Sequence, residues 1–131
     1  MKKITFILIA VISFSGFSQD SVDFEAAGIG TDWNWVEQVV YDNVQYVHGE
    51  GGTARTKSKN DMMSTVQGHI HTQAYVEWNV GKRFKIFGMQ VGCGIDSKSY
   101  AAAYAKNFKK QAIGCGVVIG GHTAINCMMD L

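Results

Sequence analysis

Two histidines stand one residue apart in the stretch Gly68-His69-Ile70-His71. Alternate residues of an extended strand point to the same face, so both imidazoles can reach one metal ion or two adjacent ions. A third histidine, His48, follows the apolar run at residues 44–47. If the two runs are strands that lie side by side, the three rings converge and predict a metal site. Spacing alone leaves ordinary surface or core histidines as the alternative.

The length and charge of the chain limit its architecture and its partners. The sequence has 131 residues, of which 12 are basic and 11 are acidic. This length is enough for one domain. The near balance of charge gives no signature of nucleic-acid binding and no reason to expect an anionic membrane surface as a partner.

The first 18 residues predict a secretory signal peptide. Two lysines begin the chain, residues 4–14 form an apolar run, and the small residues Gly16 and Ser18 precede a cut after position 18. The run is too short for a stable membrane span. We therefore expect export to the periplasm or the exterior, with residues 19–131 as the mature domain. An uncleaved anchor or a buried first strand is the alternative.

Cysteine usage points the other way. Cys93, Cys115 and Cys127 are odd in number and widely spaced, whereas a small secreted domain usually carries paired cysteines. Cys115 and Cys127 can pair across a hairpin, which leaves Cys93 over, or each can be a small buried apolar residue. The N-terminus thus indicates export, while the body resembles a cytoplasmic protein.

Hydrophobic patterning predicts a mixed α and β chain with a mainly antiparallel sheet and two short helices. A hairpin is expected around Asp42-Asn43 and another around Gly120-Gly121, because these pairs suit the positive backbone angles of tight turns. The expected elements are strands at 37–41, 44–47, 66–68, 74–78, 84–89, 113–119 and 123–128, and helices at 54–63, capped by Thr53, and at 99–106. His122 is interpreted as a surface residue beside the second turn.

Three segments give this pattern a family resemblance. They are Tyr46-Val47-His48-Gly49-Glu50-Gly51-Gly52, Gln67-Gly68-His69-Ile70-His71-Thr72 and Phe87-Gly88-Met89-Gln90-Val91-Gly92-Cys93. A strand-ending His-Gly with Gly-His-x-His about 20 residues later resembles the last two metal motifs of calcineurin-like metallophosphoesterases. The phage and bacterial branch of that family is the most similar, and the resemblance covers residues 33–131.

The resemblance implies a metal-dependent phosphoester hydrolase. His48 and His69 would ligate one divalent ion and His71 a second one, with Mn, Zn, Fe or Ni as the metals that imidazole accepts. The family fold is an αββα sandwich of two sheets with its site at the sheet ends. Residues 19–131 would supply the C-terminal half of that domain, and a phosphoester would be the substrate.

The chain also departs from the family pattern. The motifs Asp-x-His, Gly-Asp and Gly-Asn-His do not occur in it, so the bridging carboxylate and the general-acid histidine have no counterpart. The sequence therefore assigns no catalytic residue. We hypothesise a truncated or fused product that is weakly active or inactive alone, or a chain whose partner is the missing N-terminal half. The alternative is a small exported, non-catalytic metal-binding or interaction domain.

Overall fold

The computed structural model describes residues 37–94 and 111–129, and the predicted signal peptide and the predicted helix at 99–106 lie outside them. The described elements follow in the order β1 Gln38–Tyr41, β2 Val44–Val47, α1 Ala54–Asn60, β3 Ser64–Gln67, β4 Ala74–Val80, β5 Lys85–Val91, β6 Gly114–Ile119 and β7 Thr123–Met128. Within these ranges, no helix has the length and apolar character needed to cross a membrane.

Five strands form a mixed sheet in the order β1-β2-β3-β5-β4, and β6 and β7 form a separate antiparallel hairpin. The pairs β2–β3 and β3–β5 are parallel, whereas β1–β2 and β4–β5 are antiparallel. The expectation of a mainly antiparallel sheet is therefore wrong for its centre. The reason is the crossover helix α1, which returns the chain to the end of the sheet where β2 began.

Local sequence features place several element boundaries correctly. Asp42 and Asn43 both adopt positive φ, 50° and 59°, and so form the tight turn between β1 and β2. The Thr53 side chain accepts a hydrogen bond from the Thr56 amide and caps α1, as predicted. The helix ends at Asn60 rather than at residue 63, and β3 begins at Ser64, two residues earlier than expected.

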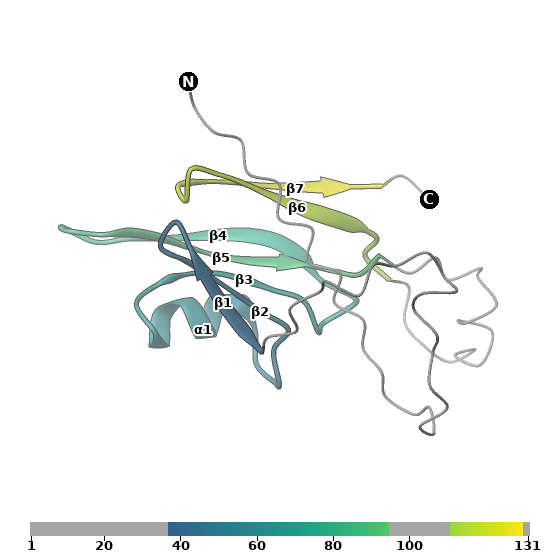
Figure 1. The fold of residues 1–131 in the computed structure, drawn as a ribbon. Coiled ribbons are helices and arrows are strands. Elements are labelled where there is room, and N and C mark those ends of the chain that lie inside the picture. Colours follow the sequence, from purple (N-terminus) through teal and green to yellow (C-terminus); the bar gives the residue numbers. More distant parts are fainter. Residues whose placement is uncertain (1–36, 95–110, 130–131) are drawn as a thin grey trace, which may run out of the picture.

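The structure has three layers (Figure 1). The β6–β7 hairpin covers one face of the five-strand sheet, and α1 lies on the opposite face. Successive residues of β5 point to opposite faces of the sheet, so alternate β5 positions meet the helix and the hairpin. A Cβ at Gly88 would lie 2.6 Å from the Ala54 carbonyl oxygen of α1, whereas Met89, on the other face, packs against Gly116 of β6.

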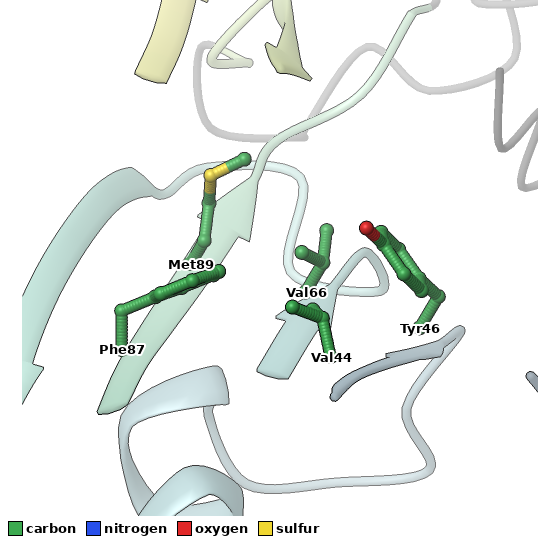
Figure 2. Packing of buried hydrophobic residues seen from close by; sticks show 5 residues of the cluster. All are labelled: Val44, Tyr46, Val66, Phe87 and Met89. Atoms are coloured by element: carbon green, nitrogen blue, oxygen red, sulfur yellow. The ribbon is translucent and has the colours of Figure 1, made fainter. Parts of the chain in front are cut away.

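The hydrophobic core lies on the hairpin side of the sheet. It consists of Val44, Tyr46, Val66, Phe87 and Met89, which are all buried. Figure 2 shows these side chains on one side of β2, β3 and β5, with α1 on the other side. Val118 and Ala124 of the hairpin pack against them, so the hairpin closes the core.

The layer between the sheet and α1 is polar instead. Gln45 is 2% exposed and Thr65 is fully buried. The Gln45 Nε2 atom donates to Thr65 Oγ1 and to Asp61 Oδ2, both at 2.8 Å. The hydrogen bond from Gln45 is the main cause that lowers the pKa of Asp61, and the hydrogen bond from the Lys57 ammonium is the next. Directed hydrogen bonds, rather than apolar packing, thus hold the helix to this part of the sheet.

The cysteines of the hairpin are not core residues. Cys115 on β6 and Cys127 on β7 are both exposed, and Cys93 after β5 is half-buried. The interpretation of Cys115 and Cys127 as small buried apolar residues is therefore wrong. The reason is strand alternation, because Gly116 and Val118 occupy the inward positions of β6.

Gly88→Ala should destabilise the fold by about 2 kcal/mol, because its new methyl group would meet rigid helix backbone. Gly116→Ala should cost less, since the methyl group would meet two side chains, the flexible end of Met89 and the Cγ1 atom of Val91, rather than backbone. Gly94→Ala is the matched control; none of the described atoms lies within 4 Å of that Cβ, so its change should stay within about 0.5 kcal/mol. Urea unfolding of the three variants tests this order, and an equal cost for all three would contradict it.

Candidate functional site

Three parallel strands end at the same edge of the sheet. β2, β3 and β5 run in one direction, with Val47 opposite Gln67 and Gln67 opposite Gln90. His48 follows β2 directly, and His69 follows β3 by two residues. The carboxyl ends of parallel strands are where sheets of this kind usually hold ligands. This edge is therefore the candidate functional site.

The structure brings His48 and His69 together at this edge. His48 Nε2 and His69 Nδ1 are 3.3 Å apart. The two rings meet edge to face, with centroids 5.2 Å apart and an interplanar angle of 86°. Their nitrogens thus point at one another across the gap between β2 and β3, which matches the predicted proximity of the two strand ends.

The prediction that His69 and His71 share one face of an extended strand is wrong. Strand β3 ends at Gln67, and His69 has a φ of +66°, so the two histidines do not lie on an extended strand. The left-handed conformation at His69 turns the chain sharply, and the Ile70 amide donates to the Gly68 carbonyl at 2.8 Å. The turn, rather than strand alternation, aims the His69 ring at His48.

His71 lies at the border of the site. Its carbonyl oxygen accepts a hydrogen bond of 2.8 Å from the Ala112 amide, which ties the loop to the segment before β6. The charge of its ring acts on His48. Across residues 37–94 and 111–129, however, no group of three or more His, Cys, Asp or Glu side chains is placed to hold a metal ion.

Two buried glutamines hold the loops around the histidine pair. Gln90 is fully buried; its Nε2 donates to the Gly68 carbonyl, and its Oε1 accepts from the Ala54 amide at 3.2 Å. Gln67 is 1% exposed, and its Nε2 donates to the Gly52 carbonyl at 3.2 Å. Sequence reasoning missed both residues. The sequence feature that could have identified them is an uncharged polar residue inside a strand, at a position where buried strands usually carry an apolar residue.

The pKa of His48 lies below its ordinary value of 6.5. Burial is the main cause, and the charges of His69 and then His71 add to it. The lowered pKa favours the neutral imidazole of His48 at pH 7, which is the form of histidine that ligates metals.

The other residues considered in the sequence have different surroundings. Glu50 is exposed. The Arg55 Nε atom lies 2.7 Å from Glu77 Oε2, and its guanidinium lies over the Tyr75 ring, 4.8 Å from the centroid. His122 is exposed, and its Nδ1 lies 2.6 Å from the Gly120 carbonyl oxygen.

Comparisons of the chain with protein-family models, with curated proteins and with solved structures gave no match. The interpretation of this edge therefore depends on its own residues and geometry.

In the metal-free chain, NMR titration of His48 should give a pKa below 6.5, and His69→Ala should raise it because one cause of the lowering is removed. The unfolded chain then takes up this proton at a higher pH than the folded chain. The free energy of unfolding should consequently fall as pH drops through 6.5 and level off below the folded pKa. A His48 pKa at or above 6.5 would contradict this account.

Proposed function

We propose that this chain is a metal-binding member of the metal-dependent phosphoester hydrolases, similar to the calcineurin-like metallophosphoesterases. His48, His69 and His71 would be its metal-ligating residues. The observation that carries the proposal is the approach of His48 Nε2 to His69 Nδ1 at the carboxyl ends of parallel strands. The sequence resemblance assigns metal ligands to these same positions.

The separation of the two nitrogens fits a shared cation. Nitrogen ligands at about 2.0 to 2.1 Å from a tetrahedral metal lie about 3.3 to 3.4 Å apart. The measured separation is 3.3 Å. A direct hydrogen bond between the rings gives a similar distance, and an ion would bind once the two rings turn so that both lone pairs meet at the metal.

The donor set suits divalent ions of the Mn, Fe, Ni and Zn series, because these accept neutral imidazole. The lowered pKa of His48 reduces competition from protons at neutral pH. When bound, such an ion supplies Lewis-acid activation of water and of a phosphoryl oxygen. His48 and His69 would hold it, while Gln90 fixes the Gly68 carbonyl and so the start of the loop that carries His69.

Efficient hydrolysis requires carboxylates that this sequence does not supply in a family motif. We propose that they come from a partner segment that carries the absent N-terminal motifs, and that the chain alone is weakly active. The second candidate is an exported, non-catalytic metal-binding or interaction domain. It is favoured by the sequence, in which the carboxylate-bearing motifs of the hydrolase family do not occur.

Calorimetric titration of the chain with Zn²⁺ or Mn²⁺ tests the ligand assignment. His48→Ala and His69→Ala should each weaken binding at least tenfold, and His71→Ala should weaken it as well. His122→Ala is the matched control, because this exposed histidine lies at the hairpin turn. Affinity that is unchanged in His48→Ala and His69→Ala would overturn the assignment.

Hydrolysis of a generic aryl phosphate with added Mn²⁺ separates the two candidate functions. The hydrolase proposal predicts slow turnover that His48→Ala and His69→Ala abolish and that His122→Ala leaves unchanged. Metal binding without any turnover would favour the non-catalytic domain. Turnover that persists in both variants would show that the activity belongs to another site or to a contaminant.

A further inference from the structure

Cys115 and Cys127 are directly opposite one another in the β6–β7 hairpin. The register pairs Gly114 with Met128, Cys115 with Cys127 and Gly116 with Asn126. Opposed residues of an antiparallel pair project their side chains to the same face. Both cysteines are exposed, on the face turned away from the core.

The spacing of the two backbones permits a disulfide after a small local adjustment. The Met129 amide donates to the Ile113 carbonyl at 3.0 Å, which makes this a hydrogen-bonded pair that continues the hairpin register. Hydrogen-bonded pairs alternate with non-hydrogen-bonded pairs along an antiparallel ladder. Cys115 and Cys127 lie two residue pairs nearer the turn than Ile113 and Met129, so they are also a hydrogen-bonded pair. Opposed Cα atoms at such positions are about 5.5 Å apart, within the range most common for disulfides. The two cysteines are free thiols in the structure, and their opposed Cβ atoms, typically about 5.5 Å apart at hydrogen-bonded positions, must approach to about 4 Å when the sulfurs bond.

We propose that Cys115 and Cys127 form a cross-strand disulfide that closes the open end of the β6–β7 hairpin. Backbone pairing on both sides of the cysteines holds them in register, at Ile113–Met129 and at Gly116–Asn126. Cys93 instead lies beside Ile113 in a parallel bridge. The sequence evidence for export is consistent with oxidation, because disulfides persist in oxidising compartments.

The oxidation is a two-step thiol–disulfide exchange. The thiolate of one cysteine attacks the disulfide of an oxidant such as oxidised glutathione, forms a mixed disulfide and releases one glutathione thiolate. The second thiolate attacks the protein sulfur of that mixed disulfide and releases the second glutathione. Two electrons pass to the oxidant, and the two thiol protons end on the two released glutathione molecules.

The disulfide would benefit the hairpin for a physical reason. A two-stranded ribbon is marginally stable by itself, and here it must cover the core formed by Met89 and its neighbours. A link at the end opposite the Gly120-Gly121 turn restricts the unfolded chain and keeps both strands over the sheet. The proposal does not depend on the metal site, so its test uses metal-free protein with chelator.

Equilibration with oxidised glutathione, alkylation under denaturing conditions and trypsin digestion test the proposal. The sequence has no Lys or Arg after residue 110, so both cysteines fall in one tryptic peptide, residues 111–131. We expect this peptide to escape alkylation and to be about 2 Da lighter than its reduced form. The oxidised chain should also melt roughly 5 to 10 °C higher than the reduced chain.

Variants distinguish this pair from the other pairings. Cys93→Ser should keep both the mass loss and the rise in melting temperature, whereas Cys115→Ser and Cys127→Ser should lose both. Alkylation of both cysteines after oxidation would overturn the proposal. A cross-link from residues 111–131 to the peptide at 86–98, which contains Cys93, or a disulfide-linked dimer would overturn it as well.

Discussion

The buried side-chain amide of Gln90 is the interaction on which the arrangement of the other elements depends. It accepts from the first amide of α1 and donates to the Gly68 carbonyl, while the Gln90 main-chain oxygen accepts from Asn126 of the hairpin at 3.1 Å. One residue thus joins the helix, the loop of the candidate site and the hairpin. A buried polar group that loses its partner costs about 1 to 3 kcal/mol. An apolar side chain here would remove the Gln90 partner of the Ala54 amide at that cost, and the Gly68 carbonyl would keep only its hydrogen bond from the Ile70 amide.

This polar layer also explains how the helix approaches the sheet so closely. Gly88 brings the Ala54 backbone near β5, and Gln90, two residues further on the same face, meets the amide of that residue. Strands in the centre of a parallel sheet are ordinarily apolar on both faces. The departures from this rule in β3 and β5 cluster beneath the loops that carry His48 and His69, which is where a local conflict most often has a functional origin.

The sequence predicted those features that short-range chemistry determines. The Asp42-Asn43 turn, the Thr53 cap and strand β7 are close to expectation, because each depends on residues within one turn or one strand. Parallel pairing of β2 with β3 was missed, since it follows from where α1 delivers the chain. The approach of His48 to His69 was expected, but the left-handed His69 that achieves it was not, because nothing in the local pattern specifies a positive φ there.

The candidate site and the hairpin are connected through main-chain hydrogen bonds. The His71 carbonyl accepts from the Ala112 amide, the Ala112 carbonyl accepts from the Cys93 amide, and the Cys93 carbonyl accepts from the Gly114 amide. Gly114 directly precedes Cys115, so these bonds run from a predicted metal ligand to the open end of the hairpin. These hydrogen bonds form a continuous main-chain connection through which the proposed disulfide would restrain the backbone of His71.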